Sequence, residues 1–421
     1  MVDAAPGRLP GDTAGPPAPA PSPPPPEPFP FRLAPADSGT PSRLYARRRD
    51  LAEPRQIRLP SGDVAEWVTG YDEVSQVLRD RRFSRNFRYP GAPRMVAEGD
   101  LSLVPDAIVN VDPPEHTRLR RTIQSAFRPG HEVTWRPVVE GIVTELLDQV
   151  ASAGPPADLV AGFASLLPIR VMCELLDVSP DDQQRLIGWT GIFFSTATAS
   201  LAERVEANRE FLGYVRALAA EHRTDPGTGL VDALIHSRDA QDALTEPELE
   251  QMIVAMFIGG QENTSATLAR GIFALLRRPE ALAALRADPG LIPAAVEEIL
   301  RYELPTEGAF LRVTTTDTAL GSAVVPKGCA VQASLAAANR DPGHFPDAER
   351  FDIRRDPNPH LAFGAGAHFC VGAPLARLEL RTALAALIAR FPGLQLAIDP
   401  ADATFTQDTL VRALRALPVI W

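Results

Sequence analysis

The ten residues from Phe363 to Gly372, FGAGAHFCVG, constrain this chain more than any other stretch. Glycines surround a single cysteine, Cys370, and leucines at helical spacing follow directly after it. Pro374 stands early in that pattern, where its missing N–H costs little. We therefore predict a tight loop that holds Cys370 just before a helix N-terminus. The helix dipole and free N–H groups there stabilise a thiolate.

Four uses of such a sulfur are open. His368 could act as a base for a nucleophilic Cys370, although a separation of two residues in an extended turn tends to direct the side chains apart. A zinc site would need more thiolates, and Cys173 and Cys329 are distant and lack CxxC spacing. A buried structural cysteine is the third use. Thiolate ligation of haem iron fits best, because one cysteine is enough and the glycines let the backbone approach a flat macrocycle.

This loop resembles the cysteine-ligand loop of the cytochrome P450 family, FGxGxHxCxG, at every fixed position. The resemblance implies haem b as the cofactor and Cys370 as the ligand of its iron. It also implies that Phe363, Gly364, His368 and Gly372 belong to the haem-binding loop. The expected fold is then the cytochrome P450 fold, which is mainly α with small β-sheets.

The composition agrees with a large globular protein. The chain has 421 residues, of which 45% are hydrophobic, and a net charge of −11, which disfavours nucleic acid and anionic membranes as partners. Three cysteines make no disulfide framework, and neither a membrane span nor a signal pattern is evident, so we expect a cytoplasmic protein. Residues 1–30, rich in Pro and Ala, are predicted to be a disordered tail. The resemblance then makes 31–421 a single haem domain.

One basic segment is a candidate for anion binding. His116 and Arg120 lie four residues apart on a predicted helix, so they share a face and can bind one anion together. Taken alone, a solvated helix face is the simpler explanation of this pair. The resemblance to the family's HxxxR segment implies instead that they bind the haem propionates, together with His368 and with Arg312 in a strand-like run.

A long helix is predicted from the capping box of Thr245 and Glu248 to Arg278. Its middle holds Gly259 and Gly260, each of which costs about 1 kcal/mol in a helix interior. Close approach of a flat ligand explains such a pair, and so does a close crossing of two helices.

The segment from Gly259 to Thr264 resembles the family's oxygen-binding groove, A/G-G-x-D/E-T-T. This resemblance implies a distal oxygen-handling group of Glu262, Asn263 and Thr264. Asn263 occupies a position that is usually threonine. An amide donates and accepts hydrogen bonds but passes a proton on less readily than a hydroxyl. The proton route is then expected to use ordered water, Thr264 or a substrate hydroxyl.

Glu298 and Arg301 lie three residues apart and can form a charge-assisted pair on one helix face. Most such pairs are surface pairs of little energetic value. Here the position before the cysteine loop resembles the family's ExxR, which implies a structural network with Arg350 as its third member.

Substrate contacts are expected in four places. One is the aperiodic loop of residues 85–110, and the resemblance adds the long helix, the segment after ExxR and a turn near the carboxyl end. The candidate pocket residues are Phe87, Tyr89, Met95, Ala255, Ile258, Thr306, Ala309 and Leu410.

The resemblance implies a haem-thiolate monooxygenase that uses O2 and takes electrons from a ferredoxin and its reductase. Hydroxylation or epoxidation of a polyketide or peptide natural product is the expected reaction. Oxidative C–C or C–O coupling of aromatic groups is an alternative that Asn263 motivates, because coupling needs less controlled proton delivery. A haem-binding sensor or carrier without turnover is a third reading.

Overall fold

The computed structural model describes residues 25–29, 45–46, 55–88, 92–96, 104, 107–127, 132–196, 199–239, 243–407 and 409–421. Tyr89, a predicted pocket residue, lies outside this part of the chain. The predicted boundary of the tail at residue 30 is wrong. Glu27 and Pro28 form strand β1, and Phe29 is buried against the core, because the strand β2 offers them a sheet edge.

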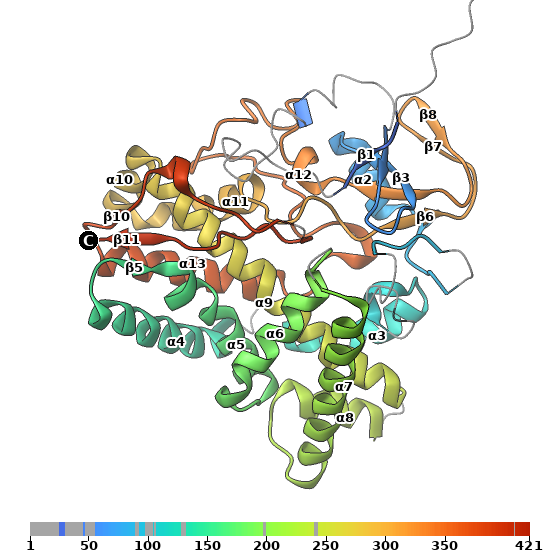
Figure 1. Ribbon diagram of the computed structural model, residues 1–421, viewed down its shortest axis with the longest axis horizontal. Coiled ribbons are helices and arrows are strands. Elements are labelled where there is room, and N and C mark those ends of the chain that lie inside the picture. The colour runs from blue at the N-terminus through green and yellow to red at the C-terminus, as the bar shows by residue number, and fades with distance from the viewer. Residues whose placement is uncertain are drawn as a thin grey trace, which may run out of the picture.

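Helices make up most of the described chain (Figure 1). The α-helices are α2 (Tyr71–Arg79), α3 (Glu115–Gln124), α4 (Glu132–Ala153), α5 (Leu166–Leu176), α6 (Gln183–Phe194), α7 (Leu201–Thr224), α8 (Leu230–Asp239), α9 (Glu246–Leu276), α10 (Pro279–Ala287), α11 (Ile292–Tyr302), α12 (Leu335–Ala338) and α13 (Ala373–Arg390). Short 3₁₀ turns occur at Ile108–Asn110, Ser125–Phe127, Pro180–Asp182, Pro289–Leu291, Gly366–His368 and Pro400–Asp402, and a π-helical turn at Val160–Ala164. The mainly helical fold with small sheets that we expected is confirmed.

The long helix α9 begins where the sequence predicts. The Thr245 N–H donates to Glu248 Oε2 at 2.8 Å, and the Glu248 N–H donates to Thr245 Oγ1 at 3.3 Å, which completes the capping box. The helix ends at Leu276, shortly before Pro279 opens α10. Figure 1 shows α9 crossing the middle of the molecule, between the helices α4, α5 and α13 and the region of β3 and β6.

Three sheets are described. The largest has the order β1-β2-β3-β9-β6-β4, formed by β1 (Glu27–Pro28), β2 (Arg55–Arg58), β3 (Val64–Val68), β9 (Ala330–Ala333), β6 (Arg312–Thr314) and β4 (Phe83–Ser84). The second has the order β10-β11-β5, from β10 (Gln395–Leu396), β11 (Pro418–Ile420) and β5 (Ala157–Asp158), and the third pairs β7 (Thr318–Leu320) with β8 (Ala323–Val325). Strands β2 and β3 form a hairpin that turns at Gly62, whose φ is +90°.

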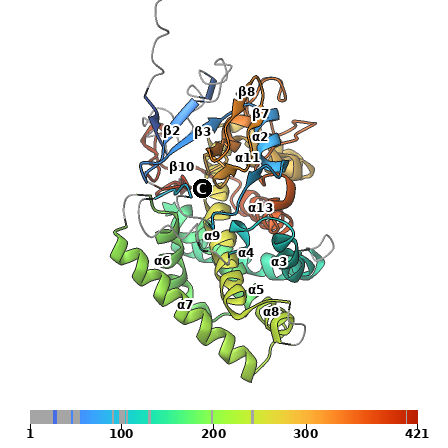
Figure 2. The same ribbon diagram turned by 90° about the vertical axis from the view of Figure 1, so that its right-hand side faces the viewer.

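The main hydrophobic core lies among α4, α5, α9, α11 and α13, and the large sheet has a core of its own. Helices α6 and α7 pack along another side of α9, as Figure 2 shows. In the described part of the chain, no helix combines the length and the apolar character that crossing a membrane requires. This packing leaves a cavity beside α9.

Candidate functional site

The cysteine loop has the conformation that its glycines predict. Gly364 and Gly366 have φ of +69° and +71°, a region that other residues rarely adopt. A Cβ on Gly366 would also lie 2.5 Å from the carbonyl oxygen of Leu78, so no side chain fits there. The Cys370 N–H donates to the Phe363 carbonyl at 2.9 Å, and this bond closes the loop just before α13 begins.

Cys370 lines a cavity of about 440 Å³ and has no disulfide partner. The side chain is open to this space but enclosed by protein beyond it, and burial raises the pKa of its thiol. The N–H groups of Gly372 and Ala373 and the charges of Arg120 and Arg377 oppose that rise. A metal ion bound to the sulfur would complete the stabilisation of the thiolate.

The cavity lies between α9 and the cysteine loop, and the predicted pocket residues within the described chain all line it: Phe87, Met95, Ala255, Ile258, Thr306, Ala309 and Leu410. Trp189, Phe193, Phe194 and Phe211 of the helices α6 and α7 add aromatic side chains. Phe363, Gly364 and Gly372 of the cysteine loop line it as well. The lining is therefore mostly apolar, as a pocket for a small organic molecule requires.

One end of the cavity gathers basic side chains from three elements. His116 and Arg120 come from α3, Arg312 from β6 and His368 from the cysteine loop, and all four line the cavity. The His116 and His368 rings lie 4.2 Å apart between centroids. Burial and Arg120 lower the pKa of His116 to about 4, and burial lowers the pKa of Arg312 to about 10. An anion bound here would favour the protonated forms of His116 and Arg312 and would therefore raise both pKa values.

Among the residues that the structure describes, two buried nitrogens at this end have no hydrogen-bond partner, namely Nε2 of His368 and Nε of Arg312. Arg312 uses another nitrogen, Nη1, to donate to the Phe83 carbonyl at 3.0 Å. Buried donors are normally satisfied, so these two require an acceptor from outside the chain. The propionates of a haem ligated by Cys370 are such acceptors, and the residues therefore fit this cofactor.

The two glycines of α9 differ in their surroundings. A Cβ on Gly259 would meet nothing within 4 Å, and this residue borders the cavity. Gly260 borders the cavity too, but a Cβ on it would lie 2.3 Å from Met172 Sδ of α5, so this glycine also permits the close crossing of α5 and α9.

The structure brings together only two of the three predicted distal residues. Asn263 and Thr264 line the cavity, and Oδ1 of Asn263 is buried without a hydrogen-bond partner. Glu262 is not part of the lining, and burial raises its pKa. Asn263 and Thr264 are therefore the two predicted distal residues that border the cavity.

The pair of Glu298 and Arg301 is completely buried, with Nε–Oε2 and Nη2–Oε1 distances of 2.7 Å. Arg350 was the wrong third member. It supplies only its carbonyl, which accepts from Arg301 at 3.1 Å, whereas the Arg355 guanidinium donates to Glu298 at 3.2 Å. Asn358 Nδ2 also donates to Glu298, at 3.3 Å. The turn after Phe351 carries Arg355 back to the helix α11, which spacing alone did not reveal.

Sequence reasoning missed several polar residues of the lining, among them Gln332 and Arg412. Arg412 Nη1 lies 3.2 Å from Glu307 Oε2, and the bridge between Thr306 and Val411 brings their two segments together. No local pattern marks Gln332 or Arg412. For Arg412 the reason is that its contact with Glu307 joins parts of the chain about one hundred residues apart.

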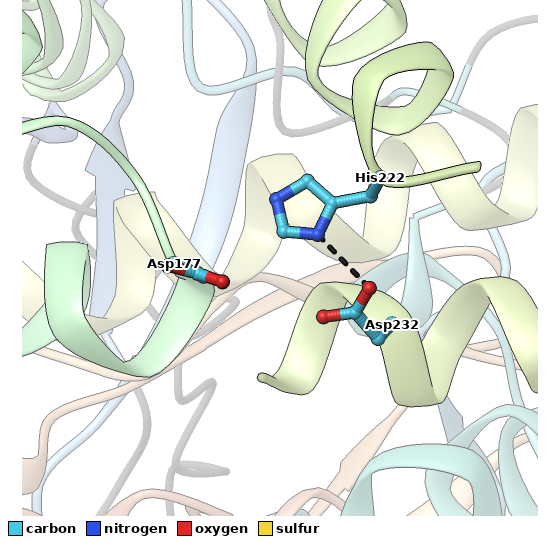
Figure 3. Close-up of side chains that lie close together, drawn as sticks. All are labelled: Asp177, His222 and Asp232. Carbon is cyan, nitrogen blue, oxygen red and sulfur yellow. Dashed lines mark hydrogen bonds and ion pairs between the residues drawn. The ribbon is translucent and has the colours of Figure 1, made fainter. Parts of the chain in front are cut away.

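A second group of charged side chains does not line the cavity (Figure 3). Asp177, His222 and Asp232 have oxygen and nitrogen atoms within 4.8 Å of one another. His222 Nδ1 lies 3.0 Å from Asp232 Oδ1, and the N–H groups of Gly227 and Gly229 donate to the same carboxylate. These bonds join the end of α7 to the start of α8, so a structural role accounts for the group.

Comparison with known proteins gives consistent matches. Residues 175–289 and 290–409 match the family model described as Cytochrome P450. The chain is 41% identical over 367 residues to mycinamicin IV hydroxylase/epoxidase of Micromonospora griseorubida, covering 87% of this chain and 92% of that protein. The LnmA cytochrome P450 hydroxylase from the leinamycin pathway of Streptomyces atroolivaceus has a TM-score of 0.85 at 37% identity, covering 94% and 100%. CxnD, a cytochrome P450 for C–S bond formation in chuangxinmycin biosynthesis, has a TM-score of 0.85 at 35% identity, covering 94% and 97%.

The residues that match the family model contain both sides of the cavity, because they include α9 and the cysteine loop. The solved relatives cover nearly the whole chain and share its fold, which agrees with the arrangement expected from the sequence. Sequence, cavity and fold therefore lead to one conclusion: this chain belongs to the cytochrome P450 family of haem-iron monooxygenases.

Proposed function

We propose that the cofactor is haem b and that Cys370 is the axial ligand of its iron. The observation that carries this proposal is that Cys370 lines the cavity from a loop that ends at a helix N-terminus. Phe363, Gly364 and Gly372 border the same face of the cavity. Bound haem iron with a thiolate ligand supplies the chemistry that activates O2.

We further propose that His116, Arg120, Arg312 and His368 hold the two propionates. The unpartnered nitrogens of His368 and Arg312 support this assignment, and so does the gathering of four basic side chains at one end of the cavity, where burial and neighbouring arginines lower the pKa of His368. Gly259 leaves space on the opposite side, where a planar group would lie close to α9. Residues from about 27 onward would then form a single haem domain.

The reaction that we propose is hydroxylation or epoxidation of a natural-product intermediate of the polyketide or peptide type. The names of the relatives support this substrate class, and the apolar, aromatic lining of the cavity suits such a molecule. Asn263 and Thr264 would orient the water that delivers protons on the distal side. The electrons would come from a ferredoxin and its reductase, and reduced partners of this kind place the reaction in the cytoplasm.

A second candidate is oxidative bond formation without transfer of oxygen to the product. Asn263 favours it, because an amide in place of a hydroxyl passes protons on less readily. The similarity to CxnD, which forms C–S bonds, also agrees with it.

The test begins with the purified, dithionite-reduced protein under CO. We expect a Soret band at the long wavelength of thiolate-ligated haem, and we expect Cys370→Ser to abolish it. Its absence in the wild type would refute the proposed cofactor site, and a wild-type spectrum in Cys370→Ser would refute Cys370 as the ligand.

The second experiment measures turnover. Each compound that shifts the spin state of the ferric haem is incubated with the protein, ferredoxin and reductase, and the mass of the product is determined. A product mass increased by one oxygen supports monooxygenation, whereas a loss of two hydrogens supports coupling.

A further inference from the structure

The carboxylate of Glu297 joins three segments next to the Cys370 loop. Glu297 lies on α11, directly before the buried ExxR glutamate. Arg377 of α13 donates to it from Nε at 2.8 and 3.1 Å and from Nη2 at 2.8 Å, and Arg381 donates from Nη2 at 3.2 Å. His360, in the segment that leads into the loop, approaches it through Nε2 at 3.1 Å. One carboxylate therefore ties the start and the end of the cysteine loop to α11.

His360 is fixed from both sides of its ring. Its side chain is only 3% exposed, and its Nδ1 accepts the N–H of Ala362 at 3.2 Å. Because Nδ1 is the acceptor, Nε2 carries the proton and donates to Glu297. Burial opposes ionisation of Glu297, but the hydrogen bonds from His360 and Arg377 outweigh it and lower its pKa to about 2. Glu297 is thus an anion at neutral pH.

The network reaches Cys370 through Phe363. The Arg377 guanidinium lies over the Phe363 ring, 4.5 Å from its centroid, a distance at which a cation is attracted to the ring face. The Phe363 carbonyl in turn accepts the N–H of Cys370 at 2.9 Å. Arg377 does not line the cavity, so Glu297 and Arg377 act on the sulfur from outside the cavity.

We propose that Glu297 is a positioning residue for the thiolate: by holding Arg377 over Phe363 and fixing His360, it sets the position of Cys370 relative to the haem iron. This inference rests on the proposed function, since it takes Cys370 as the iron ligand. Glu297 differs from Glu298, which is completely buried and ties α11 to the segment around Arg355 rather than to the cysteine loop.

The test uses haem-loaded protein reduced by dithionite under CO, so that no redox partner is needed. The rate at which the long-wavelength Soret band converts to the shorter-wavelength form without thiolate is measured for the wild type and Glu297→Ala. We expect conversion to be about tenfold faster in the variant, which corresponds to about 1.4 kcal/mol. Asp148→Ala is the matched control, because it removes an exposed pair with Arg390 at the other end of α13, and it should convert like the wild type.

A second readout separates positioning from a general loss of stability. Glu297→Gln removes a negative charge near the thiolate, and Arg377→Gln removes a positive one, so the reduction potential of the haem should rise in the first and fall in the second. Arg377→Lys keeps the positive charge but loses the bidentate contact with the Glu297 carboxylate. Its rate of conversion to the shorter-wavelength form should lie between those of the wild type and Arg377→Gln. If Glu297→Ala does not fold, these three variants carry the test.

Three outcomes would overturn the proposal. They are a wild-type conversion rate in Glu297→Ala, equal acceleration in Asp148→Ala, and potentials in Glu297→Gln and Arg377→Gln that move in the same direction. Failure of the proposed function is distinguishable from all three, because the wild type itself would then lack the long-wavelength band.

Discussion

At the scale of single residues, Gly259 and Gly260 face different neighbours. Alanine at either position gains the same helix propensity, so a comparison of the two variants isolates the contact with Met172. Because the Met172 side chain is flexible, we expect Gly260→Ala to be about 1 kcal/mol less stable than Gly259→Ala, at the low end of the cost of overpacking. Urea unfolding measures the difference, and equal stabilities would show that α5 and α9 do not need the glycine.

Asn263 occupies the position at which the motif that this segment resembles usually has threonine. Its Oδ1 is buried without a partner, and the side chain borders the cavity. In Asn263→Thr, a hydroxyl that both donates and accepts would add one hydrogen bond to the proton route. One such bond is worth about 1 kcal/mol, so we expect the ratio of peroxide to product to fall by roughly five- to tenfold. Peroxide and product are quantified together, and an unchanged ratio would exclude Asn263 from the distal group.

At the scale of elements, the buried pair of Glu298 and Arg301 joins α11 to the segment before the cysteine loop. Removing one partner of a buried pair leaves a charge uncompensated, so Glu298→Gln should lower the free energy of unfolding by about 3–5 kcal/mol. Arg355→Ala should cost less, because Arg301 still neutralises Glu298. Arg350→Ala should change it by less than about 0.5 kcal/mol, since only the carbonyl of Arg350 takes part. Urea titration of the three variants checks this order, and a large loss in Arg350→Ala would contradict it.

At the scale of the whole molecule, the cationic end of the cavity links haem binding to acid stability. His116 has a pKa of about 4 in the folded chain against an ordinary value of 6.5, so the unfolded chain binds the additional proton between these values. Stability of the haem-free protein should therefore fall as pH drops from about 6.5 to about 4, by up to roughly 3 kcal/mol. Bound propionates would favour the protonated form of His116 and would therefore reduce this loss of stability.

Thermal unfolding of haem-free and haem-loaded protein at pH 7 and pH 5 tests this link. We expect the haem-free protein to lose more of its stability between the two values. His116→Gln, which cannot ionise, should remove part of the difference between the two forms, and the rest belongs to His368, whose pKa is also lowered by burial. An equal response of both forms to acid would contradict the placement of the propionates beside His116.

The sequence by itself determined the features that depend on neighbouring residues. The glycines and Cys370 specify the loop, and Thr245 and Glu248 specify the start of α9, because turn and cap conformations follow from local sterics and hydrogen bonds. The family's fold followed from the cysteine loop and three further segments in the same order.

Only the tertiary structure decided which distant residues meet. It paired Gly260 with Met172, replaced Arg350 by Arg355 beside Glu298, and tied Glu297 to the cysteine loop. These contacts depend on how elements pack across long separations in sequence, where close packing leaves room for one side chain and not for its neighbour. A local pattern carries no such information, and the surroundings of a residue are therefore decided only when the chain folds.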